Sequence, residues 1–211
     1  MNISSTMGTD KVSMLQDTKN NMRGVIQVGS HWAEEFEGWV SIGVKDFIFF
    51  EPVLSNYVKL CRILPVSDNI KIYQLALGNK TGKMMMFTET EHQGKSCSVL
   101  EPLLHLEQYP DIEFTGRELV DMDKLDNIKY NRRRFDHLHI DAQGYELEVF
   151  KGAEQSLKSI LSITTEVYRK ELYRGCPMIE DVTNYLYDQG FELMEVFWRG
   201  LSWGDAKYSR I

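Results

Sequence analysis

The chain has 211 residues, 43% of them hydrophobic, which suits one domain with a sizeable core. Its 31 acidic and 24 basic residues give a formal net charge of −7, which disfavours binding to a nucleic-acid backbone. No run approaches the roughly 18 apolar residues of a membrane span. The three widely spaced cysteines argue against a disulfide framework or a structural zinc site, so we expect a cytoplasmic protein without a membrane segment.

The order of apolar runs and helical patterns predicts a single α/β domain. Residues 1–21 are polar and lack the apolar stretch of a secretory signal, and we interpret residues 1–23 as an N-terminal arm before a domain that spans residues 24–211. The expected strands are 25–29, 47–50, 70–77, 135–141, 160–167, 191–198 and 206–211, and the expected helices are 34–42, 54–64, 146–159 and 179–189. Strands separated by helix-length segments predict parallel crossovers, whereas the short link before the last strand predicts an antiparallel hairpin.

Two segments depart from this alternation. Residues 82–126 form a long insertion with short strands of their own, at 84–88 and 117–122, and they fit either a substrate-recognition lid or a plain β-arm. The basic run Arg132–Arg134 fits either a phosphate clamp or a solvated turn into the next strand. That turn would lie at the end of its strand opposite to the one where α/β sheets bind ligands.

The turn after the first strand has features of a ligand-binding loop. Gly29 follows the strand and precedes a helical pattern, so the chain turns tightly and offers a helix N-terminus to an anion. His31 and Glu34 occupy the second and third glycine positions of the dinucleotide fingerprint, so a pyrophosphate would fit poorly. A smaller ligand with a carboxylate, such as the methionine part of S-adenosylmethionine, remains compatible.

Glu51 closes the second strand, 22 positions after Gly29. An acid at a spacing of about 20 binds ribose hydroxyls in nucleotide-binding folds, because a carboxylate accepts hydrogen bonds from the 2′,3′-diol. The alternative is an acid that only caps the next helix, since Pro52 follows at a position typical of a first helical turn.

Two further carboxylates close neighbouring strands. Asp141 ends the apolar strand before Gly144, and Glu166 lies at the end of the following strand. Because ligands bind at the carboxyl edge of open α/β sheets, both side chains could converge on one pocket. The alternative is a loop-organising Asp and a Glu satisfied by backbone N–H groups.

These residues together resemble the FkbM family of methyltransferases. The resemblance covers about residue 24 to the C-terminus, and it is most specific in the block Asp141–Ala153. It also includes the segments 25–31, 50–52, 77–79, 96–100, 165–168, 171–176 and 204–206. The resemblance implies a Rossmann-like class I methyltransferase fold: a seven-stranded, mostly parallel sheet with helices on both faces, the last strand antiparallel, and here a β-arm insertion.

The resemblance also implies S-adenosylmethionine as cofactor. The expected cofactor-binding residues are Gly29, Ser30, His31, Glu51, Pro52, Ala76, Ser98 and Asp141. Four positions depart from the family pattern: Gln27 replaces a usual acid, Ala33 a usual glycine, Cys97 interrupts a serine run, and Gln143 stands where many members have Glu. Gln27 puts in doubt an acidic contact from the first strand to the amino group of the cofactor.

The expected reaction is O-methylation of a hydroxyl on a sugar or another small metabolite. Asp141 and Glu166 are the expected catalytic residues, as a base for the hydroxyl proton or as holders of a divalent cation, although two carboxylates are too few to predict a metal. His31, His92 and His139 are further candidate bases. The alternatives are a non-catalytic cofactor-binding scaffold, a nucleic-acid methyltransferase, and a nicotinamide-dependent oxidoreductase, which His31 disfavours.

Overall fold

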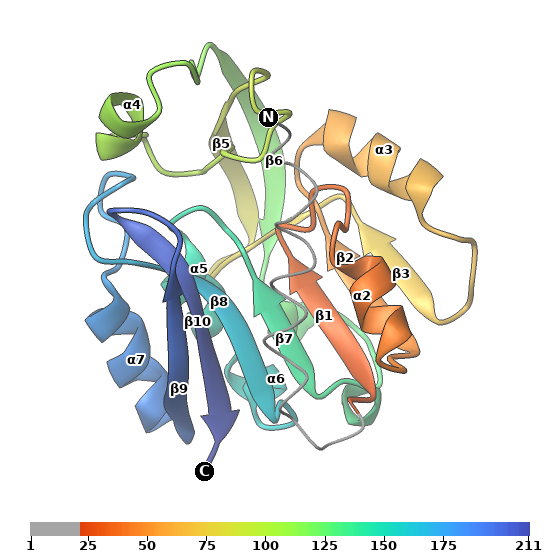
Figure 1. Ribbon diagram of the computed structural model, residues 1–211. Helices are drawn as coiled ribbons and strands as arrows, with labels where there is room; N and C mark the ends of the chain where they lie inside the picture. The colour runs from red at the N-terminus through yellow and green to blue at the C-terminus, as the bar shows by residue number, and fades with distance from the viewer. Residues whose placement is uncertain (1–21) are drawn as a thin grey trace.

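A central seven-stranded sheet organises the protein, whose computed structural model describes residues 22–211 (Figure 1). Residues 1–21 of the expected N-terminal arm lie outside the described part. The strand order is β3-β2-β1-β7-β8-β10-β9. The bounds are β1 Gly24–Val28, β2 Asp46–Phe50, β3 Ile70–Tyr73, β7 His137–Ile140, β8 Ser162–Tyr168, β9 Phe191–Trp198 and β10 Trp203–Arg210.

Strand direction follows the expected pattern. The strands β1, β2, β3, β7 and β8 run parallel to one another, whereas β10 is antiparallel to both β8 and β9. The mostly parallel sheet and the final hairpin are therefore confirmed. The expected strand over residues 70–77 is wrong as a single element, because β3 ends at Tyr73 and Ala76–Leu77 forms β4 in a second sheet.

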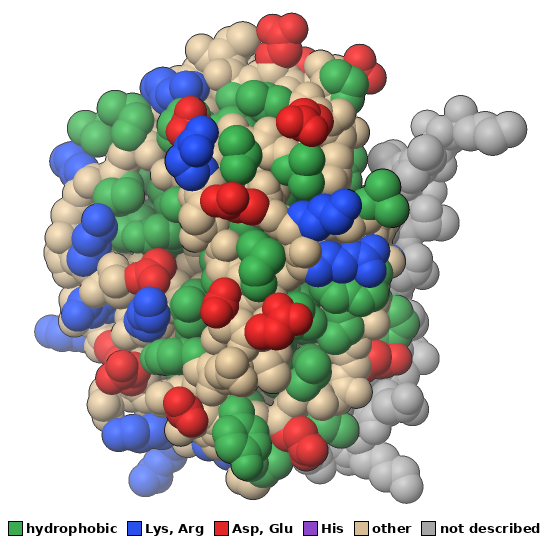
Figure 2. Space-filling view, turned by 90° about the vertical axis from the view of Figure 1, so that its left-hand side faces the viewer, with side chains coloured by type: hydrophobic (Ala, Val, Ile, Leu, Met, Phe, Trp, Pro, Cys, Tyr) green, Lys and Arg blue, Asp and Glu red, His purple; other side chains and the backbone are tan. Residues whose placement is uncertain are grey.

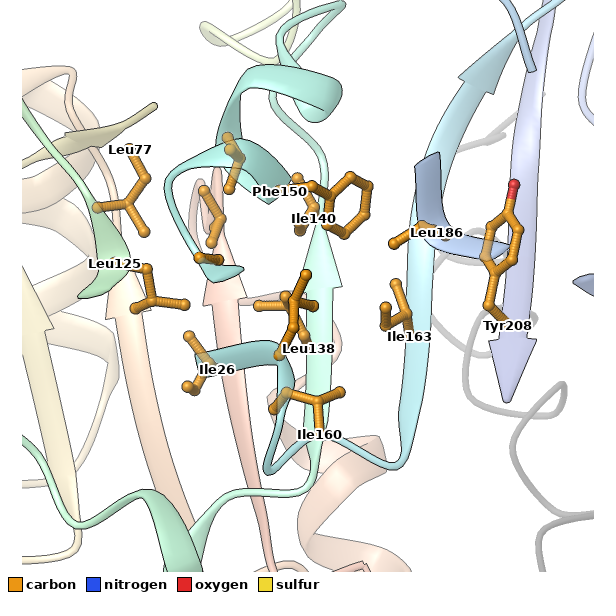
Figure 3. Packing of buried hydrophobic residues seen from close by; sticks show 14 of the residues in the cluster. Ile26, Leu77, Leu125, Leu138, Ile140, Phe150, Ile160, Ile163, Leu186 and Tyr208 are labelled. Carbon is orange, nitrogen blue, oxygen red and sulfur yellow. The ribbon is translucent and has the colours of Figure 1, made fainter. Parts of the chain in front are cut away.

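One face of the sheet carries the larger apolar core. Figure 3 shows Ile26, Leu138 and Ile140 from neighbouring strands beside Phe150 and Leu186 from the covering helices. These helices are α5 Glu146–Lys151, α6 Glu154–Leu157 and α7 Ile179–Asp188. The alternation along β1 and β7 places every second side chain in this core.

The expected helix over residues 146–159 is divided into α5 and α6. A Cβ atom at Gly152 would overlap the carbonyl oxygen of Gly78, so glycine allows the two backbones to touch at the break. Helix α6 then starts anew, because the Asp126 carboxylate accepts hydrogen bonds from the backbone N–H groups of Gln155 and Ser156 at 2.8 and 2.7 Å.

The other face is covered on the β1–β2–β3 side by α2 Phe36–Ser41 and α3 Leu54–Ile63. Trp39 and Leu60 from these helices pack with Phe47 and Phe49 of β2. Helix α2 starts two residues later than expected. His31 and Ala33 have φ angles of 46° and 55°, which lie outside the right-handed helical region.

Two strands of the insertion, β5 and β6, pair with β4 in a second, three-stranded sheet in the order β4-β6-β5. The elements of the insertion are β5 Gly82–Thr88, α4 Leu104–Gln108 and β6 Gly116–Asp123. In Figure 1, the insertion lies beyond the end of the main sheet toward which the parallel strands point. The run Arg132–Arg134 forms a 3-10 turn before β7, at the opposite end of the sheet.

The described surface has mixed character on the face that Figure 2 shows. Basic, acidic and apolar side chains are interspersed there over the side of the molecule to which α7 belongs. Among residues 22–211, no helix has the length and apolar character needed to cross a bilayer.

Leu138→Ala should destabilise the fold strongly, because this side chain is fully buried in the centre of the sheet. We expect the free energy of unfolding to fall by roughly 2–5 kcal/mol in urea denaturation, the usual cost of such a truncation. Leu119→Ala, on the solvent side of β6, is the matched control and should cost less than about 0.5 kcal/mol. Equal losses in the two variants would contradict this description of the core.

Candidate active site

One cavity lies at the carboxyl edge of the main sheet. Its volume is about 990 Å³, which is large enough for a cofactor and part of a second ligand. Gly29, Glu51, Asp141 and Glu166, from the ends of β1, β2, β7 and β8, all line this cavity. The structure therefore brings Asp141 and Glu166, which the sequence predicted to share a pocket, to one cavity together with the ends of β1 and β2.

The turn after β1 depends on Gly29. This residue has a φ of +70°, and a Cβ atom would overlap the backbone carbonyl oxygen of Asp141. The next side chain, Ser30, is buried, and its hydroxyl contacts the carbonyl oxygens of Gln27 and Phe50 at 3.1 and 3.2 Å. It also accepts a hydrogen bond from the Phe50 N–H at 3.0 Å, so the Ser30 hydroxyl joins β1 to β2.

His31 is held on three sides. Its backbone N–H donates to Glu51 Oε2 at 2.8 Å, while Nδ1 lies 2.7 Å from Glu34 Oε1 and Nε2 lies 2.9 Å from the carbonyl oxygen of Gln93. Both ring nitrogens therefore lie within hydrogen-bonding distance of an acceptor. Burial acts to raise the pKa of Glu34, but His31 and Lys95 outweigh it and lower the pKa to about 2. The ring of His31 is therefore held between the Glu34 carboxylate and the backbone of the insertion.

Glu51 is a buried acid that points its two oxygens at backbone donors. Oε2 accepts from His31, and Oε1 accepts from the Val53 N–H at 2.9 Å. Burial nevertheless raises the pKa of Glu51 to about 7, because desolvation outweighs the two hydrogen bonds that favour the charged form. A ligand that donates hydrogen bonds to this carboxylate would favour its ionised state.

The two expected catalytic carboxylates meet through an amide. Gln143 Nε2 donates to Asp141 Oδ1 at 2.6 Å and to Glu166 Oε2 at 2.9 Å. The hydroxyl of Tyr168 also donates to Glu166 Oε2. Sequence reasoning paired Asp141 with Glu166 but did not find the amide between them.

The remaining expected cofactor residues divide into two groups. Pro52 and Ala76 line the cavity beside Glu51. Ser98 is fully buried and does not line it, since its hydroxyl donates to the carbonyl oxygen of Gln143 at 2.6 Å. Ser96, two residues earlier in the insertion, is at the cavity wall.

Two features of the cavity were missed from the sequence. Gln27 Nε2 donates to Glu35 Oε2 at 2.9 Å, so an acid from the following loop lies beside the position where the first strand lacks one. Gln27 Oε1 is buried and accepts no hydrogen bond from residues 22–211. The contact between Gln27 and Glu35 could not be predicted from their spacing in the sequence, because the contact depends on the left-handed residues between them.

His105 is the second missed feature. It lies on the short helix α4, lines the cavity, and packs among Tyr109, Phe114 and Tyr173, with ring centroids 5.0 to 5.5 Å away. Burial lowers the pKa of His105 to about 4, so the ring is neutral at neutral pH. No periodicity in the insertion indicated that this helix would reach the site.

The other candidate bases, His92 and His139, also line the cavity. Burial lowers the pKa of His92. His139 is buried on β7. In the described part of the chain, no three His, Cys, Asp or Glu residues are grouped closely enough to hold a metal ion.

The strand order, the antiparallel strand between β8 and β9, and a cavity at the carboxyl edge define a Rossmann-like methyltransferase fold. The sequence profile of the Methyltransferase FkbM domain matches residues 27–193. The chain therefore belongs to the FkbM methyltransferase family and is an S-adenosylmethionine-dependent methyltransferase.

Individual proteins agree with this placement. The chain is 23% identical over 190 residues to the 2-O-methyltransferase NoeI of Sinorhizobium fredii (strain NBRC 101917 / NGR234). The aligned region covers 86% of this chain and 77% of NoeI. Among solved structures, magnesium protoporphyrin IX methyltransferase of Synechocystis PCC 6803 with bound SAM has a TM-score of 0.55 at 10% identity, over 98% of this chain and 79% of that one. A Streptococcus pneumoniae protein provisionally described as a tRNA (m1A22) methyltransferase has a TM-score of 0.55 at 13% identity, over 95% and 72%. These structural likenesses establish the fold.

Glu51→Gln should flatten the pH dependence of stability. The ordinary pKa of this carboxyl is 4.5 and its folded pKa is about 7, so the folded protein holds the proton more tightly. The resulting stabilisation is present below pH 4.5 and is lost as the pH rises toward 7. Between pH 5 and 7, we expect wild-type protein to lose roughly 2 kcal/mol of unfolding free energy more than the variant. Urea denaturation at several pH values measures this difference.

Glu37→Gln is the control, because Glu37 is an exposed acid of the same region. Its pH dependence should match that of the wild-type protein. If the unfolding free energy of Glu51→Gln also had the pH dependence of the wild-type protein, the ionisation of Glu51 would not be linked to folding.

Proposed function

We propose that this protein methylates a hydroxyl group of a sugar or a similar polyhydroxylated small molecule, with S-adenosylmethionine as methyl donor. The observation that carries this proposal is the single cavity that joins Glu51, at the end of β2, to Asp141 and to an aromatic wall from the insertion. In this proposal, residues 24–211 form the methyltransferase domain, and residues 82–126 within that domain contribute to acceptor recognition. A cytoplasmic location is part of the same proposal.

The residues present fit the methyl donor. Glu51 is placed to accept hydrogen bonds from the ribose diol, with Pro52 and Ala76 forming nearby walls. The unpartnered Gln27 Oε1 and the adjoining Glu35 carboxylate would hold the ammonium group, so the acid missing from β1 is supplied by Glu35. The turn at Gly29 leaves room for the ligand against the backbone.

The rest of the cavity fits a sugar better than a nucleic acid. Tyr109, Ile112, Leu172 and Trp203 supply aromatic and apolar wall, and the neutral ring of His105 offers a polar group for a hydroxyl. Buried aromatic rings with polar ends suit ligands that are apolar on one face and polar at their edge. The relative named as a 2-O-methyltransferase supports oxygen as the methylated atom.

The acidic residues that line the cavity also favour a neutral acceptor over a nucleic acid. Glu34, Glu35 and Glu37 line the cavity together with Asp141 and Glu166. Carboxylates repel phosphate oxygens, so a phosphate backbone would enter this cavity at an electrostatic cost. A neutral acceptor avoids that cost.

In this mechanism, the bound donor supplies an electrophilic methyl group. The chain must orient the acceptor hydroxyl, exclude water and take up its proton as the oxygen–carbon bond forms. We assign Asp141 as the group that accepts the proton of the acceptor hydroxyl. Glu166 Oε2 accepts hydrogen bonds from both Gln143 and Tyr168, so two neighbouring side chains hold this carboxylate in place.

Glu51→Ala should weaken cofactor binding without preventing folding. Loss of a charge-assisted acceptor costs about 1.5–3 kcal/mol. Affinity for S-adenosylhomocysteine, measured by calorimetry, should therefore fall on the order of 10- to 100-fold. Glu192→Ala removes an exposed acid on β9 that does not line the cavity, and this variant should bind as wild type does. Unchanged affinity in Glu51→Ala would refute the ribose assignment.

Asp141→Asn should abolish most methyl transfer while preserving cofactor binding. The amide keeps the size of the side chain but removes its charge and basicity, so turnover should fall roughly 10²- to 10⁴-fold. Transfer of label from radioactive S-adenosylmethionine to a panel of mono- and oligosaccharides measures it and also identifies the acceptor. Asp121→Asn, an exposed position on β6, is the control. Near-normal turnover in Asp141→Asn would reassign the base, and cofactor binding without any labelled sugar would favour a non-catalytic scaffold.

A further inference from the structure

Two aromatic rings meet at the side of the cavity where the insertion contacts the last hairpin of the main sheet. Tyr109, directly after α4, and Trp203, at the start of β10, are partly buried, and both line the cavity. The indole Nε1 of Trp203 donates a hydrogen bond to the Tyr109 hydroxyl at 2.7 Å. This bond fixes the two rings relative to one another, although they lie 94 positions apart in the sequence.

Further contacts between the insertion and the main sheet hold this aromatic pair in place. Ser202 Oγ donates to Gln108 Oε1 at 2.6 Å. The backbone N–H groups of Leu103 and His105 both donate to the carbonyl oxygen of Leu172, at 3.0 and 3.1 Å. In Figure 1, α4 accordingly lies next to the turn between β9 and β10. Side chains that are fixed before a ligand arrives lose less conformational entropy when it binds.

The register between β8 and β10 places Trp203 close to the strand end that carries Glu166. Asp205 pairs with Glu166, and Trp203 pairs with Tyr168, in the antiparallel ladder. Because side chains two positions apart point to the same face, Trp203 follows Glu166 on that face, about 7 Å further toward the carboxyl end of β8. A ring that packs on Trp203 therefore has one edge near the strand ends that line the cavity.

His105 adds a polar group to this aromatic surface. It is 3% exposed and lines the cavity, and its Nδ1 has no hydrogen-bond partner among residues 22–211. Burial lowers the pKa of His105 to about 4, so the ring is neutral at neutral pH and has one donor and one acceptor nitrogen. A ligand hydroxyl both donates and accepts hydrogen bonds, so it can pair with either nitrogen.

We propose that Trp203 and Tyr109 form a stacking platform for the methyl acceptor, a pyranose whose apolar C–H face packs on the two aromatic rings. His105 binds one hydroxyl at the edge of the sugar, and another ring hydroxyl faces the strand end at Asp141. A pyranose suits this surface because it has C–H groups on one face and hydroxyls around its edge. The inference rests on the proposed function for the choice of a sugar as acceptor.

The test measures sugar binding to the full chain saturated with S-adenosylhomocysteine, so it involves no methyl transfer. The probes are the methyl glycosides of glucose, galactose, mannose and their 6-deoxy forms, and the acyclic polyol sorbitol is the control ligand. We expect at least one glycoside to bind, and the C–H protons of one face to receive the strongest saturation-transfer difference signal in NMR. Sorbitol has similar hydroxyls but no ring face and should not bind.

Variants of the platform locate the binding site. Trp203→Ala should weaken the affinity for that glycoside by roughly tenfold, because the ring contact is lost. Trp203→Phe keeps an aromatic ring, so its affinity should stay within about threefold of the wild type. Tyr187→Ala removes an exposed aromatic side chain on α7 that does not line the cavity, and it should bind as wild type does.

The inference is overturned if none of the glycosides binds, or if Trp203→Ala binds as tightly as Trp203→Phe. If Trp203→Ala does not fold, Tyr109→Ala takes its place, and unchanged affinity in that variant has the same meaning. Failure of the proposed reaction gives a different result, namely a glycoside that binds at Trp203 but accepts no methyl group. Sugar methylation with an unchanged acceptor KM in Trp203→Ala would leave the reaction intact and reject the platform.

Discussion

The site depends on the contact between Gly29 and the backbone carbonyl of Asp141. Only a residue without a Cβ atom can turn at the end of β1 while the end of β7 touches it. This contact brings two neighbouring strand ends together, and the Ser30 hydroxyl then joins β1 to β2. The acids that follow β2 and β7 consequently face the same cavity. Any side chain at Gly29 would separate these strand ends and disperse the groups that line it.

The cavity collects acids at an electrostatic cost, and neutral hydrogen-bond donors offset part of this cost. Glu51 receives two backbone N–H bonds, and Glu166 receives an amide and a hydroxyl. Glu146 lies fully buried below the site, and two backbone N–H groups donate to its Oε1. Burial raises the pKa of Glu146 above its ordinary value despite these bonds. Neutral donors leave the acids able to change their protonation state, which fixed positive charges would oppose.

Strand periodicity allowed the sheet and the positions of Gly29, Glu51, Asp141 and Glu166 to be predicted from the sequence. Parallel strands place their carboxyl ends at one edge, so a residue at a strand end needs only its strand to be recognised. Gln143, His105 and Glu35 were not assigned to the site, because their positions depend on left-handed loop residues or on the fold of the insertion. The break between α5 and α6 was missed for a related reason. It occurs where Gly152 packs against the backbone of Gly78, which is far away in the sequence.

The bonds between the first turn and the insertion have a kinetic consequence. His31 contacts the Gln93 carbonyl oxygen, and Glu34 forms an ion pair with Lys95 at 3.0 Å, so residues 93–95 are fastened across one side of the cavity. A ligand that enters or leaves on this side must first break both contacts. Exchange of ligands would then be slower than diffusion allows and would accelerate with added salt, which screens the partly exposed Glu34–Lys95 pair. The same turn that shapes the binding site would thereby control how long a ligand remains in it.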